Sequence, residues 1–229
     1  MREIVFDTET TGLDPKAGHR LVEIGCVELF NRMPTGETFH HYVNPERSMP
    51  EDAFRIHGIG DDMLADKPKF AAVAPAFVDF IGDAPLVAHN ASFDMNFINA
   101  ELTIAGLAPI PVDRAVDTVA IARRKFPGSP ASLDALAKRF DIDLSARDKH
   151  GALLDASILA AVYLELMGGR EPGLHLAADG GRRVDHQAIA AAAVPREARA
   201  PRPHAPSAAE LAAHAMFLDN AVKDPIWRR

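Results

Sequence analysis

The N-terminal segment places two acidic residues at the end of an apolar run. Residues Ile4–Phe6 continue directly into the motif FDTETTG, which contains Asp7 and Glu9. An apolar run of this kind, followed by turn residues, predicts a buried strand. Side chains alternate between the faces of a strand, so the two carboxylates share one face at a separation of roughly 6–7 Å. Like charges held there repel each other and lose hydration, so the fold must supply something that neutralises them.

Two further acids stand at the ends of apolar elements. Asp94, in HNASFDMNF, lies just inside an expected helix that follows the apolar run PLVAH, and Asp155, in HGALLDA, lies on a largely apolar helical segment. If these residues converge on Asp7 and Glu9, the cluster is stable only with cations. All-oxygen ligands favour hard ions, so the sequence predicts a site for two divalent metal ions, Mg²⁺ or Mn²⁺.

The three acidic segments also resemble a known family. FDTETTG, HNASFDMNF and HGALLDA are similar to the three motifs of the DEDDh family of 3′–5′ exonucleases, including His150 five residues before the last acid. The resemblance covers residues 1–168 and implies an RNase H-like α/β fold. It implies that Asp7 bridges both ions, that Glu9 and Asp155 complete the water-binding one, and that Asp94 supports the other. It also implies that His150 is the general base, and we expect it on a loop before the helix.

Hydrophobic patterning agrees with an α/β fold. Three strands are expected over residues 3–11, 20–30 and 37–45, with a turn at MPTG, and a further strand over residues 84–89. Helices are expected over residues 70–82, 92–106 with Ser92 as N-cap, 115–128, 132–140 and 150–169. Strands that first form a meander and then alternate with helices indicate a mixed sheet flanked by helices.

Composition restricts how the chain can bind nucleic acid. The net charge is −7, which excludes a broad basic surface that grips phosphates. The single cysteine, Cys26, lies in an apolar run and is expected to be a buried thiol. No long apolar segment is present, and the expected location is the cytoplasm. A place at the nucleoid-associated replisome is what the resemblance of other segments to replicative proofreading subunits implies.

Substrate contacts are expected beside the acids. The family resemblance identifies His57, in RIHGI, as a contact to the terminal nucleotide, with Asp52 or the neighbouring Glu51 as a second candidate. Asp7, Glu9 and Asp155 are also expected to contact the substrate through their place at the reacting phosphate. Three residues that flank the acids are further candidates for touching the strand: Thr10, Asn90 and Phe93.

The chain changes character after Gly169. Residues 177–206 are dominated by Ala, Pro, Arg and Gly, so residues 169–206 are expected to form a flexible linker. Residues 207–229 are expected to form a docking helix with a capping box at Ser207 and a narrow apolar stripe. An isolated helix of this length is marginal in water, which indicates that it folds on a partner.

The linker and tail suggest protein partners. The tail, together with RIHGI, RKFPG and SLDALAKRF, is similar to the proofreading subunits of bacterial replicative DNA polymerases. This implies binding to the catalytic (alpha) polymerase subunit through residues such as Leu211, Leu218 and Trp227. The segment 171–176, with Leu174 and Leu176, resembles a sliding-clamp-binding peptide in which Glu171 replaces the usual Gln. A helix-terminating loop is the alternative for this segment. A small theta-like subunit is a further candidate partner.

Two other functions compete with proofreading. The first is a stand-alone DEDDh nuclease that trims RNA or short oligonucleotides, which the linker and tail argue against. The second is a non-catalytic adaptor between polymerase and clamp, which would have no use for clustered carboxylates. The sequence thus favours a metal-dependent 3′–5′ exonuclease that removes mismatched 3′-terminal nucleotides during DNA replication.

Overall fold

The structure, a computed structural model, describes residues 1–145, 150–169 and 205–221. The chain divides into an N-terminal unit, residues 1–175, and a C-terminal unit, residues 176–229. Residues 170–204 of the expected linker, which include Leu174 and Leu176, and Trp227 in the tail lie outside the described residues, so the structure does not bear on them.

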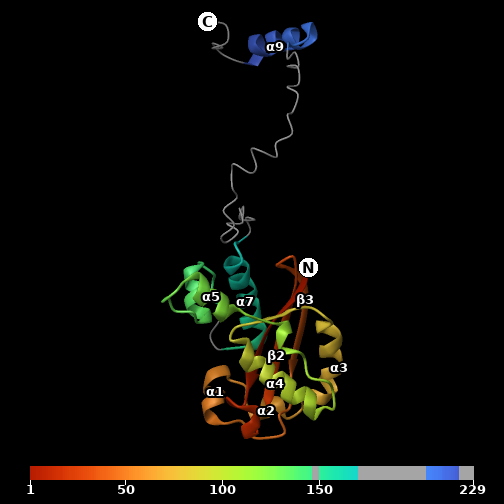
Figure 1. The fold of residues 1–229 in the computed structure, drawn as a ribbon, viewed down its shortest axis with the longest axis vertical. Helices are drawn as coiled ribbons and strands as arrows, with labels where there is room; N and C mark the ends of the chain where they lie inside the picture. Colours follow the sequence, from red (N-terminus) through yellow and green to blue (C-terminus); the bar gives the residue numbers. More distant parts are fainter. Residues whose placement is uncertain (146–149, 170–204, 222–229) are drawn as a thin grey trace, which may run out of the picture. The chain divides into compact units, whose positions relative to one another are not determined.

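A five-stranded mixed sheet forms the centre of the N-terminal unit (Figure 1). Its strands, in the spatial order β3-β2-β1-β4-β5, are β3 (Met33–Tyr42), β2 (Leu21–Phe30), β1 (Arg2–Thr10), β4 (Leu86–Ala88) and β5 (Ala115–Asp117). The first three strands pair antiparallel, and β4 and β5 join β1 in parallel. The expected mixed sheet flanked by helices is confirmed.

Helices cover both faces of this sheet. They are α1 (Glu51–His57), α2 (Asp61–Leu64), α3 (Phe70–Ile81), α4 (Ala91–Ile104), α5 (Thr118–Lys125), α6 (Leu133–Arg139) and α7 (Ala152–Leu166), with short 3₁₀ turns η1 (Pro15–Ala17) and η2 (Val112–Arg114). Residues of α3 and α4 pack on one face of the sheet, and residues of α7 pack on the other. Residues from α5 and α6 pack against α7 in a separate small core.

Successive side chains of β1 point to opposite faces of the sheet. Ile4 and Phe6 enter the core formed with α3 and α4, whereas Val5 packs against α7. Glu3, on the same face as Val5, accepts a buried hydrogen bond of 2.7 Å from the hydroxyl of Tyr163 in α7. Asp7 has the same parity as Glu3 and Val5, so the strand presents its acidic end to the α7 side.

The turn between β2 and β3 differs from the expected one. Residues 34–36 of the MPTG motif lie inside β3, and the chain reverses instead at Asn31 and Arg32, whose φ angles are 50° and 66°. A two-residue hairpin with left-handed backbone at both positions matches the right-handed twist of its strands. The Pro and Gly of MPTG misled the prediction because an exposed edge strand tolerates both residues.

Two helix starts were also predicted wrongly. Ser92 does not cap α4, which begins one residue earlier, after Asn90 in the left-handed conformation at φ 69°. The expected helix over 115–128 begins at Thr118 because residues 115–117 pair with β4 as strand β5. Helices α1 and α2 were not expected, since each is too short to show a helical period.

Glycine at position 25 allows α7 to approach the sheet closely. A Cβ atom on Gly25 would lie 2.2 Å from the backbone nitrogen of Leu153, at the beginning of α7. Gly25 pairs with Asp7 across β1 and β2. The absence of a side chain at this position therefore determines how near the first turn of α7 comes to the acidic end of β1.

The C-terminal unit contains one described helix, α9 (Ala208–Ala221). The expected capping box is present, since Ser207 Oγ accepts from the backbone N–H of Glu210 at 3.3 Å and the Ser207 backbone N–H donates to the Glu210 carboxylate at 2.8 Å. Leu218 is buried, whereas Leu211, Met216 and Phe217 are exposed. None of the helices in the described ranges is long and apolar enough to cross a membrane.

Replacing Gly25 should weaken the N-terminal unit. We expect Gly25→Ala to lower the free energy of unfolding by about 1–3 kcal/mol, because the new methyl group overlaps the backbone of α7 rather than a movable side chain. Chemical denaturation measures the change. Gly60→Ala is the matched control, since its Cβ would meet only the Phe54 side chain at 3.3 Å. Equal stability of the two variants would contradict the close approach.

Candidate active site

The acidic residues gather at the end of β1, where three elements meet. Asp7 and Glu9 come from β1 itself, Asp94 from the first turn of α4, and Asp155 from the first turn of α7. The strand β4 runs parallel to β1 and delivers α4 at its carboxyl end, which is where open α/β sheets commonly bind ligands. Asp94 and Asp155 are both buried, with 3% of their surface exposed.

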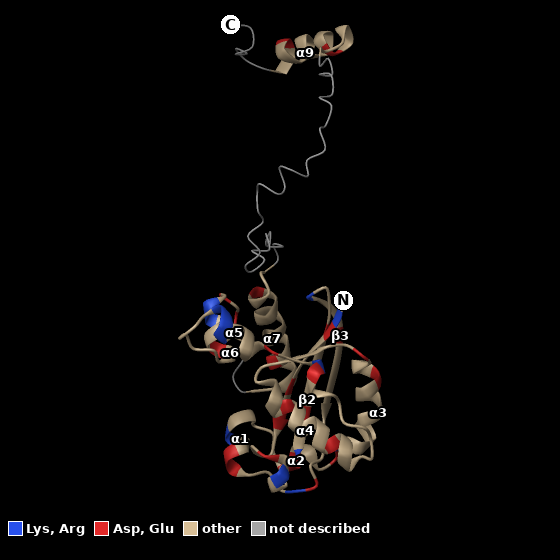
Figure 2. Cartoon of the chain, in the orientation of Figure 1, with Lys and Arg blue, Asp and Glu red and all other residues tan. Residues whose placement is uncertain are grey.

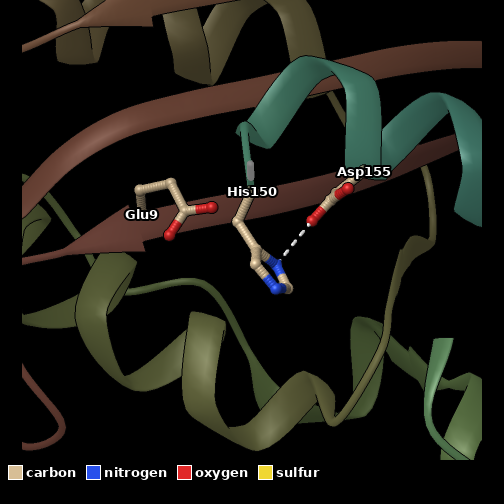
Figure 3. Close-up of side chains that lie close together, drawn as sticks. All are labelled: Glu9, His150 and Asp155. Carbon is tan, nitrogen blue, oxygen red and sulfur yellow. Dashed lines mark hydrogen bonds and ion pairs between the residues drawn. The ribbon is translucent and has the colours of Figure 1, made fainter. Parts of the chain in front are cut away.

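His150 lies between two of these acids. It precedes α7, as expected, and its Nδ1 lies 3.0 Å from Oδ2 of Asp155 (Figure 3). One potential ligand atom from each of Glu9, His150 and Asp155 lies within 4.8 Å of the others. In Figure 3 the Glu9 and Asp155 carboxylates reach toward His150 from β1 and α7. The group therefore forms a compact set of donors suited to a small cation.

Asp94 approaches from the opposite side of β1. The hydroxyl of Thr8 donates a buried hydrogen bond of 2.7 Å to Oδ1 of Asp94. Burial raises the pKa of Asp94 to about 7, although this hydrogen bond favours the charged form. Without a cation, Asp94 therefore keeps its proton at mildly acidic pH, where an ordinary aspartate has already lost it.

Asp7 lies at the centre of the repulsion. Burial raises the pKa of Asp7 well above its ordinary value, and the neighbouring carboxylates, with Asp94 the strongest of them, raise it further. Protons relieve this repulsion at low pH, and divalent cations relieve it at neutral pH. The all-oxygen donor set of the four acids fits Mg²⁺ or Mn²⁺, so the residues present agree with a divalent metal site.

A cleft of about 870 Å³ opens over these side chains. Its lining includes every predicted metal ligand, the predicted base and two of the predicted flanking residues: Asp7, Glu9, Asp94, Asp155, His150, Asn90 and Phe93. Residues 129–134, which run from the loop after α5 into the first turn of α6, form part of its wall. The sequence prediction that the acids and His150 come together therefore matches where the structure places them.

A second cavity, of about 540 Å³, adjoins the cleft and shares Thr8, Glu9 and Phe93 with it. His57 lines this cavity, is 6% exposed, and accepts a hydrogen bond of 3.0 Å from the backbone N–H of Ile59 at its Nδ1. Asp52 also lines it, but its carboxylate is largely exposed and pairs with Arg55. Thr10 is turned toward the backbone and donates to the Gly12 carbonyl at 2.6 Å.

Glu23 is a site residue that sequence reasoning missed. Its buried carboxylate accepts from the backbone N–H of Ala152, the first residue of α7, at 3.1 Å, and contacts Nε2 of His40 at 2.7 Å. A carboxylate at a helix N-terminus satisfies a free N–H and interacts favourably with the helix dipole. Glu23 thus fixes the helix that carries Asp155. The only sequence signal was a charged residue within an apolar strand.

Asp117 is a second residue that was not predicted. Its Oδ1 accepts from the backbone N–H groups of Val119, at 2.9 Å, and Asn90, at 3.0 Å. It therefore caps α5 and also fixes the turn that leads into α4. The two hydrogen bonds of Asp117 thus connect the start of α5 to the turn before α4, and both segments line the cleft.

Comparisons with known proteins agree with this geometry. The family model described as "Exonuclease" (RNase_T) matches residues 4–163. DNA polymerase III subunit epsilon of Rickettsia felis is 55% identical over 174 residues, which cover 75% of this chain and 76% of that protein. The protein of the same name from Escherichia coli is 42% identical over 238 residues, covering 99% and 97% of the two chains.

Solved structures give the same fold. The nuclease domain of 3′hExo, a DEDDh family member bound to rAMP, superposes with a TM-score of 0.62 at 19% identity, covering 72% of this chain and 91% of that chain. This likeness confirms the RNase H-like exonuclease fold that the acidic motifs implied.

Fold, acidic motifs and family match define a DEDDh-type 3′–5′ exonuclease, a class of enzyme that depends on divalent metal ions. Within the exonuclease family, the chain belongs to the DNA polymerase III epsilon subunits, the proofreading exonucleases of that polymerase. The alternative of a non-catalytic adaptor is therefore wrong.

The raised pKa values predict that divalent ions stabilise the protein more at high pH. An aspartate with a pKa near 3.9 in the unfolded chain and about 7 in the folded one costs stability as pH rises between those values, because the fold must then hold the charge. We therefore expect Mg²⁺ or Mn²⁺ to raise the thermal midpoint more at pH 8 than at pH 5.5. Asp94→Asn should reduce the difference, and equal increments in the native protein would contradict the prediction.

Proposed function

We propose that this chain removes nucleotides one at a time from the 3′ end of a DNA strand, and so excises mismatched termini during replication. The observation that carries the proposal is the convergence of five side chains in one cleft: Asp7, Glu9, Asp94, His150 and Asp155. Membership of the exonuclease family supports the reaction class.

Asp7, Glu9, Asp94 and Asp155 would hold two Mg²⁺ or Mn²⁺ ions. Asp7 would serve both ions, Glu9 and Asp155 would complete one set of ligands, and Asp94 would support the other. When bound, the ions activate the attacking water and stabilise charge on the phosphate and on the leaving 3′ oxygen. The protein holds these acids close together, and the ions offset the repulsion that raises the pKa of Asp7.

His150 accepts the proton of the attacking water. When Nδ1 carries the proton that is donated to Asp155, Nε2 is the unprotonated nitrogen of the neutral ring, which is the tautomer that a general base requires. The side chain is 49% exposed and precedes α7, so it can reach a substrate in the cleft. Asp155 thus supports His150 as well as serving as a ligand, which is a common arrangement for a catalytic histidine.

The cavity beside the cleft would receive the terminal nucleotide. His57, Phe93 and Ile56 supply polar and apolar groups to it, and Asp52 lies at its edge. A mismatched end frays at lower cost than a paired one, so the enzyme can prefer mispairs without contacts that distinguish the bases.

Substitution of the central acid tests the reaction. We expect Asp7→Ala to abolish Mg²⁺-dependent release of mononucleotides from 3′-labelled single-stranded DNA, because the ions lose their shared ligand. His150→Ala should lower the rate about 10²–10⁴-fold and leave metal binding intact, as expected when a general base is removed. Near-normal turnover in Asp7→Ala would refute the proposed metal site. Comparing the rates of the native protein on single-stranded DNA and on RNA separates proofreading from RNA trimming.

The tail would attach the exonuclease to its polymerase. The epsilon-type relatives and the exposed Leu211, Met216 and Phe217 of α9 support binding to the polymerase III alpha subunit, with Leu218 and Trp227 as further contacts. Tethering raises the effective concentration of an acidic enzyme at a primer end. The sliding clamp, bound through Leu174 and Leu176, and a theta-like subunit complete the proposed assembly.

Removal of the tail tests this attachment. We expect deletion of residues 207–229 to leave hydrolysis of free single-stranded DNA unchanged, because all the proposed ligands lie in residues 1–168, and to end co-purification with the alpha subunit. Phe217→Ala, which removes one exposed aromatic ring, should weaken co-purification with the alpha subunit and leave hydrolysis unchanged. Undiminished binding after the deletion would place the interface elsewhere.

A further inference from the structure

Among the residues that the structure describes, the lining of the active-site cleft is strongly acidic and holds, besides two histidines, one arginine. Six carboxylates and one guanidinium are among the residues that line it: Asp7, Glu9, Asp94, Asp117, Asp134 and Asp155, with Arg123. A DNA strand that enters carries a negative phosphate at every linkage. Metal ions at the acid cluster can neutralise the reacting phosphate, but the phosphates that follow need another positive group.

Helix α5 directs Arg123 into the cleft. Residues three and four positions apart share a helix face, and both Val119 and Ala120 line the same cleft as Arg123. The next face of the helix packs inward through Ala122, which is 1% exposed. Arg124 is exposed but is absent from the lining of this cleft. The two neighbouring arginines therefore face different surroundings.

Two other basic residues in or near α5 already have structural contacts. Lys125 donates to the carbonyl of Leu166 at the end of α7, at 2.9 Å. The guanidinium of Arg139 stacks over Phe126 at 4.4 Å from the ring centroid. Arg123, in contrast, makes no hydrogen bond or ion pair with the part of the chain that the structure describes, and its side chain is exposed.

Figure 2 shows the basic residues of α5 in blue, and these are Arg123, Arg124 and Lys125 in its last turn. Arginine presents a planar group that can donate two parallel hydrogen bonds to a phosphate. An arginine with no partner among the described residues, in the wall of an acidic cleft, is therefore positioned to bind an anion. The anion that reaches this cleft is the substrate strand.

We propose that Arg123 binds a non-bridging phosphate oxygen of the substrate strand on the 5′ side of the scissile linkage. This rests on the proposed function, because it requires the strand to lie in this cleft. Arg123 thereby holds the strand in register while the acid cluster acts on the terminal linkage. It is a binding residue for strands of two or more linkages and has no phosphate to bind on a mononucleotide ester.

Two substrates separate this role from general damage to the site. A single-stranded oligonucleotide has upstream phosphates, whereas thymidine 5′-p-nitrophenyl phosphate has none. We expect Arg123→Ala to lower the ratio of kcat/KM for the oligonucleotide to kcat/KM for the ester about tenfold, mainly through KM. Arg123→Lys should recover part of the loss by restoring the charge, and Arg124→Ala, the matched control on the same helix, should keep the native ratio.

Salt dependence gives an independent measurement. Each phosphate contact to a single strand contributes about 0.7 to the slope of log K against log salt concentration. We expect Arg123→Ala to reduce this slope by about 0.7 in equilibrium binding of a fluorescent oligonucleotide, measured in the His150→Ala background where turnover is slow. The slope should stay unchanged in Arg124→Ala.

The outcomes distinguish this inference from the function on which it rests. Equal losses on both substrates, or an unaltered salt slope, would overturn the phosphate contact while the exonuclease assignment stands. A native protein that hydrolyses neither substrate would overturn the proposed function, and the binding slopes of the two arginine variants would still decide the role of Arg123.

Discussion

Repulsion among buried carboxylates is the constraint on which the active site depends. Burial and the charges of its neighbours raise the pKa of Asp7, and the pKa of Asp94 reaches about 7. The protein holds these acids together with interactions that are independent of the reaction. Glu23 anchors the start of α7, Gly25 lets that helix approach β2, and the hydroxyl of Thr8 holds Asp94. The folded chain thus stores an unfavourable charge arrangement that divalent ions convert into a favourable one.

Charge distribution also explains how an acidic protein can handle DNA. With a net charge of −7, the chain does not rely on a broad basic surface. In the proposed mechanism positive charge would be supplied locally instead, by divalent ions at the acid cluster and by Arg123 of α5. Weak intrinsic affinity is compatible with attachment to a polymerase, because a tether replaces affinity with effective concentration.

The central features could be predicted because they leave strong local signals. Asp7 and Glu9 continue an apolar strand, Asp94 lies just inside a helix, and Asp155 lies on a largely apolar helical segment. The order of strands and helices indicates the mixed sheet. The features that were missed depend on contacts between distant residues. Nothing near Gly25 or Glu23 in the sequence shows that α7, more than 120 residues later, will pack there. The Asn31–Arg32 reversal and the left-handed Asn90 are backbone conformations that a competing turn or cap signal concealed.

Packing of α7 beside β1 joins the beginning of the catalytic unit to its end. Glu3 and Tyr163, 160 positions apart, share a buried hydrogen bond, and Asp155 reaches the cluster only when α7 has docked. Contacts between such distant residues form late, because closing a long loop has an entropic cost that local contacts avoid. During synthesis, a ribosome-bound chain that still lacks its last helix holds an incomplete set of ligands. The nuclease therefore becomes competent only once the whole unit has been made.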